Sequence, residues 1–126
     1  ETLTKDDYYI YPKDENIYNE ETDMILYNKD IITDDELPRI VYNDAIFVQR
    51  QVTTMKSDAA LNNVQGEYIG RAPDDFGTTI DGYNTTALGN VYGVKESKDG
   101  SKVCIIEYAK DKGGDECIVF YFDRLK

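Results

Sequence analysis

The chain has 126 residues, the length of one ordinary domain, and leaves little room for two independent cores. Its 25 acidic and 14 basic residues give a formal net charge of -11, which disfavours nucleic acid or an anionic lipid surface as a partner. His is absent and Cys occurs only twice, so most imidazole-based catalysis and His- or Cys-rich zinc sites are excluded. No apolar run approaches the roughly 20 residues that a transmembrane helix needs.

The acidity is concentrated in the N-terminal third. Residues 1–38 hold 12 acidic and 3 basic residues, net -9, and residues 39–126 hold 13 acidic and 11 basic residues, net -2. We divide the chain into an acidic N-terminal segment, 1–38, formed by a tether and the first strands, and a β-rich domain core, 39–126. Because the sequence starts with Glu1 rather than Met, we expect an upstream segment. An acidic polar lead is typical of a solvated tether and equally of a frayed terminus.

Two stretches with the same pattern come first in the chain. Residues 25–32 (ILYNKDII) and 40–47 (IVYNDAIF) both place an Asn-containing turn between apolar, strand-forming residues. Asn tolerates positive φ, so we predict a tight hairpin over residues 40–47. A short helix follows, with Ser57 as its N-cap and Gly66 as its stop. Its apolar stripe, which we expect to face the rest of the domain, is formed by Ala60, Leu61 and Val64.

The C-terminal half is predicted to consist mainly of strands. Residues 67–72 form a strand that Pro73 ends, and the polar, Gly-rich residues 73–90 are the longest irregular stretch. Three further strands, joined in part by an Asp99-Gly100 turn, form an antiparallel meander at 91–96, 102–109 and 116–122. Residues 117–122 are apolar throughout, which predicts a central strand covered on both faces. The expected fold class is α+β and β-rich: a curled antiparallel sheet or small barrel with one short helix packed on it.

The two cysteines lie in the two strands of the closing hairpin. Cys104 and Cys117 face each other only if the turn is centred between Lys110 and Asp111, which leaves Gly113 and Gly114 off-centre. A shift of two residues in the pairing would separate the two Cα atoms beyond the distance that a disulfide spans. The sequence therefore leaves two alternatives, a disulfide or two small buried hydrophobic side chains.

Acidic pairs are too common in this sequence to identify a catalytic pair. They lie at positions 6–7, 20–21, 34–36, 74–75 and 115–116, in turn-like contexts typical of solvated surface. The acidic loop that starts at Asp111 lacks the EF-hand pattern, because Gly113 and Phe122 fill its third and twelfth positions. Without His, a serine nucleophile lacks its usual base, and no phosphate-binding Gly motif is present. We predict no catalytic residue, no cofactor and no metal site.

Tyrosine is unusually frequent, with 11 in the chain, and it has two interpretations. Five tyrosines fall in the acidic segment, at positions 8, 9, 11, 18 and 27. Tyr combines a large contact area with a polar tip, so these residues are consistent with a binding surface. They are equally consistent with a plain strand whose hydroxyls line the rim of the sheet.

Residues 40–122 resemble a type of small extracytoplasmic domain of Gram-positive bacteria. The resemblance is carried by the Tyr42-Asn43-Asp44 hairpin, the short helix, the stretches 67–71 (EYIGR) and 89–94 (GNVYGV), and the two apolar closing strands. Such domains occur in lipoproteins of unknown function and beyond the membrane anchor of anti-sigma factors and regulatory peptidases. The resemblance implies a compartment and an architecture but no site residue.

From these observations we expect a non-enzymatic extracytoplasmic binding or sensing domain of a membrane-attached bacterial protein. Its partner would be a protein or cell-envelope ligand, with no nucleic acid, and it would meet the membrane only through an anchor outside this sequence. The alternative is an acidic inhibitor or decoy that binds a cationic enzyme, such as a cell-wall hydrolase, through the net -9 segment. A binding assay across salt concentrations would distinguish the two, because electrostatic steering weakens with added salt.

Overall fold

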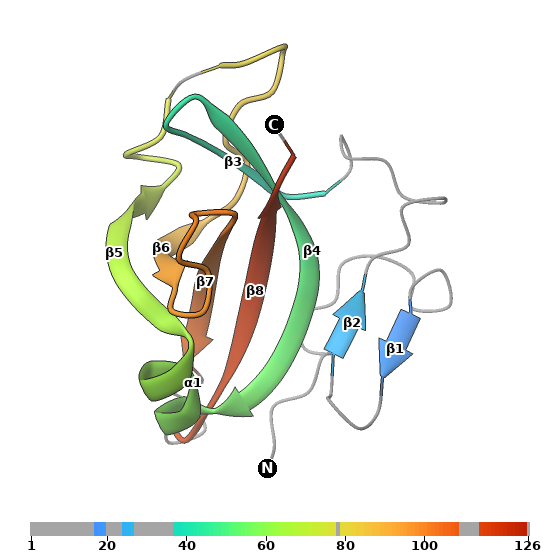
Figure 1. Ribbon diagram of the computed structural model, residues 1–126, viewed down its shortest axis with the longest axis vertical. Helices are drawn as coiled ribbons and strands as arrows, with labels where there is room; N and C mark the ends of the chain where they lie inside the picture. Colours follow the sequence, from blue (N-terminus) through green and yellow to red (C-terminus); the bar gives the residue numbers. More distant parts are fainter. Residues whose placement is uncertain (1–16, 20–23, 27–36, 78, 109–113, 126) are drawn as a thin grey trace.

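The computed structural model describes residues 17–19, 24–26, 37–77, 79–108 and 114–125 (Figure 1). These residues form a β-rich fold with one short helix, as the composition and strand patterns predict. The elements in chain order are β1 (Ile17–Asn19), β2 (Met24–Leu26), β3 (Arg39–Tyr42), β4 (Ala45–Lys56), α1 (Ser57–Asn63), β5 (Gln65–Ala72), β6 (Gly89–Val94), β7 (Lys102–Tyr108) and β8 (Glu116–Arg124).

Six strands, β3 to β8, form a curled antiparallel half-barrel. The sheet order is β1-β2-β4-β8-β7-β6-β5, and β3 also pairs with β4. The long strand β4 pairs with β8 along one edge. Its other edge is shared by β3 and the short strand β2, and β1 pairs with the far side of β2. Figure 1 looks into the curl, with β4 and β5 at its two sides and with α1 and the β6–β7 connection in front of the sheet.

The predicted hairpin at residues 40–47 is confirmed. Strands β3 and β4 pair from Arg39↔Val48 to Tyr42↔Ala45, and only Asn43 and Asp44 lie between them. Both residues have positive φ, 50° and 58°, as a two-residue hairpin turn requires for the right-handed twist of its strands. Of the similar stretch at 25–32, the structure describes only the two residues that belong to β2, so that part of the pattern lies outside the described residues.

The predicted C-terminal meander is also confirmed. Strands β6, β7 and β8 are antiparallel neighbours, and β8 lies between β7 and β4 in the middle of the sheet. Side chains of these strands alternate between the two faces of the sheet, and most of the buried ones belong to two apolar clusters. Val103, Ile105 and Phe122 belong to one cluster. The other contains Cys104, Ile106, Cys117 and Val119.

The helix forms where expected, but three details of the prediction are wrong. It ends at Asn63, and the predicted stop, Gly66, lies inside β5. Lys56, not Ser57, is the N-cap residue, and the Ser57 hydroxyl instead donates to the Gly114 carbonyl oxygen at 2.5 Å. Leu61 does not face the domain, since 53% of its surface is exposed, whereas Ala60 and Val64 are buried against the sheet. A helix of two turns leaving directly from a strand rests on the sheet along a narrow line. Only the small side chain of Ala60 and that of Val64 fit there.

The irregular connection between β5 and β6 acts as a substitute for a strand. The amides of Thr86 and Ala87 donate to the Arg39 carbonyl oxygen at 2.9 and 3.1 Å. In return, Arg39 N donates to the Thr86 hydroxyl at 3.1 Å, and Val41 N donates to the Thr85 hydroxyl at 2.9 Å. The connection thereby satisfies the outer edge of β3, which would otherwise present unpaired amides.

Candidate functional site

The pocket between the β6–β7 connection and the sheet is the candidate site. It has a volume of about 620 Å³, within the range of small-molecule sites. It opens on the face of the sheet that carries Cys104 and Cys117, away from the helix end of that face. Its lining residues are Gln51, Val94, Glu96, Ser97, Lys98, Asp99, Ser101, Lys102 and Tyr121.

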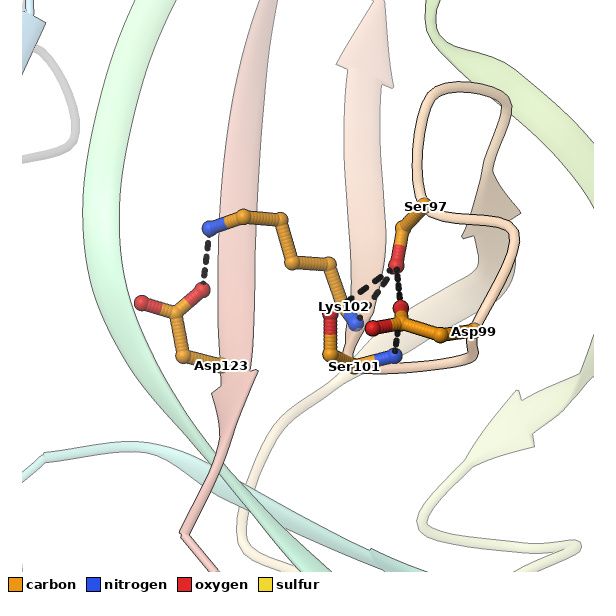
Figure 2. Close-up of polar contacts among 5 residues, drawn as sticks. All are labelled: Ser97, Asp99, Ser101, Lys102 and Asp123. Atoms are coloured by element: carbon orange, nitrogen blue, oxygen red, sulfur yellow. Dashed lines mark hydrogen bonds and ion pairs between the residues drawn. The ribbon is translucent and has the colours of Figure 1, made fainter.

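The wall of the pocket is a turn held by its own side chains, as Figure 2 shows. The Asp99 carboxylate accepts the Ser101 amide at 3.0 Å and the Ser97 hydroxyl at 3.1 Å. The Ser97 hydroxyl oxygen also accepts the Lys102 amide at 3.1 Å. The hydrogen bond from the Ser101 backbone, followed by the bonds from the Ser101 and Ser97 side chains, lowers the pKa of Asp99. The turn thus presents a fixed carboxylate at the rim.

The amine of Lys102, which follows these hydroxyls in the chain, is directed elsewhere. Lys102 Nζ lies 2.5 Å from Asp123 Oδ1, across the β7–β8 pair (Figure 2). Only the backbone amide of Lys102 contacts Ser97, so the pair does not have the geometry of a Ser–Lys nucleophile, in which the amine takes the hydroxyl proton. The arrangement is suited to holding a turn and a pocket wall in place.

The floor of the pocket offers hydrogen-bonding groups that the protein itself does not use. Gln51 and Tyr121 are opposite residues of β4 and β8, and both side chains are partly buried. Within the described part of the chain, neither side chain makes a hydrogen bond. Burial raises the pKa of Tyr121 to about 12, so its hydroxyl stays protonated at neutral pH and can donate as well as accept. These two groups are free to bind a ligand.

The two thiols lie beneath this face as buried side chains. Cys104 is opposite Tyr121 and Cys117 is opposite Tyr108, so the two are four residues apart along β8, about 13 Å at the rise of a strand. Both cysteines are free and buried. Of the two alternatives that the sequence left, a disulfide or two small buried side chains, the structure therefore shows the second. Burial raises the pKa of Cys104 to about 12 and that of Cys117 to about 11, which removes the reactive thiolate at neutral pH.

The acidic pairs that the structure describes serve turns and surface contacts. Asp75 accepts the Arg71 amide at 2.7 Å at the turn after β5, and Glu116 lies 3.5 Å from Lys56 Nζ. The described residues contain no group of three or more potential metal ligands. Several residues singled out in the sequence lie outside the described residues. They are the acidic pairs before residue 37, residues 111–113 of the acidic loop, and the tyrosines at positions 8, 9, 11 and 27.

The sequence analysis did not identify Gln51, Lys102 and Tyr121 as neighbours. Strand alternation places Tyr121 on the opposite face from Phe120 and Phe122, which was a usable signal. Strand alternation could not predict that Gln51 lies opposite Tyr121, because this pairing depends on the β4–β8 register. The bulge between Gln49 and Gln51 shifts that register by one residue.

Comparisons of the chain with protein-family models, with curated proteins and with solved structures found no match. The resemblance to extracytoplasmic domains of Gram-positive bacteria therefore stays a prediction. In the described part of the chain, no helix is long and apolar enough to span a membrane.

Proposed function

We propose that this chain is a non-enzymatic binding or sensing domain that holds a small polar ligand in the pocket between the β6–β7 connection and the sheet. The observation that carries the proposal is the pair of Gln51 and Tyr121, whose side chains line the pocket and have no hydrogen-bond partner among the residues that the structure describes. A partly buried polar group exchanges its hydrogen bond to water for one to a ligand, at a net gain of about 1 kcal/mol.

The charges of the pocket narrow the ligand class. Two carboxylates, Glu96 and Asp99, and two amines, Lys98 and Lys102, line the same space, so the lining has no net charge. The ring of Tyr121 and the side chain of Val94 add an apolar surface. This combination suits an uncharged or zwitterionic molecule of the size of a sugar or a short peptide, both of which occur in a cell envelope.

A non-enzymatic role is supported by how the nucleophile candidates are used. The chain has no His, the hydroxyls of Ser97 and Ser101 are engaged in the turn, and the amine of Lys102 is engaged in the pair with Asp123. The expected location outside the cytoplasm, on a membrane-attached protein, rests on the sequence resemblance. The alternative of an acidic inhibitor places its contact in residues 1–38, most of which lie outside the described residues.

Binding is tested by titrating ¹⁵N-labelled protein with mono- and disaccharides, amino acids and dipeptides, followed by amide chemical shifts. We expect shifts at residues 94–102 and 121, and an affinity for the responding ligand that falls about fivefold in Tyr121→Phe, because one hydrogen bond is lost. Tyr68→Phe is the matched control, since Tyr68 is exposed and outside this pocket. Equal affinities in both variants, or no response at millimolar ligand, would refute the proposal.

Two further readouts test the remaining parts of the proposal. The responding ligand is recovered after long incubation and checked for chemical change; turnover would contradict a non-enzymatic role.

Protease treatment of intact cells that express the full-length gene tests the location. Degradation of the domain without lysis is expected, and protection until lysis would place the domain inside the cell.

A further inference from the structure

A second surface, around α1 and separate from the pocket above, exposes apolar and aromatic side chains. Leu61 and Tyr68 are each 53% exposed, and they are two of the four large hydrophobic residues that stand out from the described surface. Tyr92 and Tyr108 lie beside them and are partly buried. We call the set of Leu61, Gln65, Tyr68, Tyr92 and Tyr108 the α1 surface.

The α1 surface is held in place by contacts within the protein. The rings of Tyr68 and Tyr92 lie 5.5 Å apart, measured between their centroids. The Tyr108 hydroxyl donates to Gln65 Oε1 at 3.0 Å. Side chains fixed in this way lose little conformational entropy on binding, as in the rigid aromatic anchors of protein interfaces.

Two adjoining pockets of different chemistry lie here, one within the α1 surface and one beside it. The apolar one, about 530 Å³, is lined by Leu61, Gln65, Tyr92 and Tyr108 together with Ser57, Asp58 and Gly114. The polar one, about 590 Å³, is lined by Lys56 and Asp115 together with the same Ser57, Asp58 and Gly114. No lining residue of either is shared with the pocket under the β6–β7 connection.

The charges of the polar pocket are unbalanced. In the described part of the chain, the carboxylates of Asp58 and Asp115 have no ion-pair partner, and the Asp58 carboxylate accepts only the Ala59 amide. Among the described residues of that lining, Lys56 is the one basic residue, and it lies 3.5 Å from Glu116, which offsets its charge. The described lining of the pocket next to the tyrosines therefore has an excess of negative charge, which suits a cationic group.

Edge pairing with a second copy of the chain is disfavoured at this side. The free edge here belongs to β5, and its pairing with β6 shifts register twice, between Gln65 and Tyr68 and between Tyr68 and Gly70. Such irregularities twist a strand edge and prevent continuous strand addition. A partner would be recognised by its side chains.

We infer that the α1 surface binds a segment of another protein in which a bulky apolar side chain adjoins a Lys or Arg. The apolar side chain enters the pocket of Leu61, Tyr92 and Tyr108. The neighbouring cationic group reaches Asp58 and Asp115 in the adjoining pocket. This contact is independent of the proposed ligand site, because it shares no residue with it.

The test uses three synthetic peptides of 12 residues with fluorescent labels: one with Phe flanked by Arg, one with Ala in place of Phe, and one with Glu in place of Arg. Anisotropy measures binding to the whole chain, and amide shifts locate it. We expect only the Arg–Phe peptide to bind, with shifts at residues 57–65, 92 and 108. Binding should weaken at least tenfold in Leu61→Glu and in Asp58→Lys.

Leu88→Glu is the matched control, because Leu88 is also an exposed leucine, at 72%, but belongs to neither of these pockets. Thermal unfolding of each variant confirms that the fold is retained. The inference is overturned if the Arg–Ala peptide binds as well as the Arg–Phe peptide, if Leu88→Glu weakens binding as much as Leu61→Glu, or if no peptide binds. Sedimentation showing self-association that Leu61→Glu abolishes would also overturn it, in favour of a second copy.

Discussion

The two faces of the central strands are covered in different ways. One face is covered in part by α1, which contributes the small side chains of Ala60 and Val64 to its cluster. The opposite face is covered by the irregular connection 73–88, which contributes Phe76 and Ala87 and bonds through its threonines to β3. At these contacts α1 and its C-cap contribute an alanine and a valine, whereas the irregular connection contributes a phenylalanine and an alanine. Regular secondary structure is thus a poor measure of what a segment contributes to stability.

The largest effect is expected at Phe76, the main apolar contact of the connection. Phe76 is buried and its ring meets that of Tyr42 edge-on at 5.9 Å. Phe76→Ala removes these contacts and should lower the free energy of unfolding by about 3 kcal/mol. Urea unfolding measures the change. A loss below about 1 kcal/mol would show that the connection is a dispensable cover.

The corresponding truncation under the helix should cost less. Val64→Ala removes two buried methyl groups from the apolar cluster between the helix and the sheet, and it should lower the free energy of unfolding by about 2 kcal/mol. Leu61→Ala, at the exposed position of the same helix, is the control and should change it by less than about 0.5 kcal/mol. If Val64→Ala destabilises the protein more than Phe76→Ala, the helix contributes more to stability than the irregular connection, contrary to our expectation.

The threonine contact tests whether the connection replaces a strand. Thr85→Val keeps the shape of the side chain but leaves the buried Val41 amide without its acceptor, which should cost about 1 to 2 kcal/mol. Hydrogen exchange at Val41 should accelerate in the variant. An unchanged exchange rate there would mean that the hydroxyl does not protect the edge of β3.

Glu107 lies on the face that the connection covers only in part. It lines a groove with Phe120, Phe122 and Leu88, and burial raises the pKa of its carboxyl. A folded-state pKa above the unfolded value means that folding favours the protonated form, so stability decreases as pH rises through the folded pKa. Glu107→Gln should therefore raise the Tm at pH 7, and the gain should shrink in acid. A gain that is equal at all pH values would exclude this cause.

The smallest effect is expected in the β6–β7 turn, at Asp99. Its pKa lies below the ordinary value of 3.8, so its contribution to stability is complete above the unfolded pKa and is lost as pH falls through the folded pKa. Asp99→Asn should lower the Tm slightly at neutral pH. The curves of Tm against pH for the variant and the unmodified protein should converge in strong acid. Thermal scans from pH 7 to 2.5 measure this. Curves that stay parallel would mean that the charge of Asp99 has no role.

The features that could be predicted from the sequence are those with local causes. The hairpin at Asn43 and Asp44 follows from residues that tolerate positive φ, and Gly100, with a φ of 76°, has the same role in the β6–β7 turn. The central position of β8 follows from its unbroken apolar run. These signals lie within a few residues of the structure that they specify.

The features that could not be predicted depend on contacts between distant segments. The distance between Cys104 and Cys117 depends on a hairpin register that no two-residue turn fixes. The sequence alone therefore could not decide whether the two cysteines form a disulfide. The exposure of Leu61 depends on where the sheet passes beneath α1. The pairing of residues 85–87 with β3 joins segments more than 40 residues apart. No local pattern encodes these contacts.

The burial of both thiols makes the protein convenient for site-specific labelling. The chain contains no cysteine besides Cys104 and Cys117, and the raised pKa of each suppresses its reaction with maleimides near neutral pH. A single cysteine introduced in place of the exposed Lys98 would then carry a dye at the rim of the pocket without removal of the native cysteines. Such a reporter would turn occupancy of the pocket into a fluorescence signal.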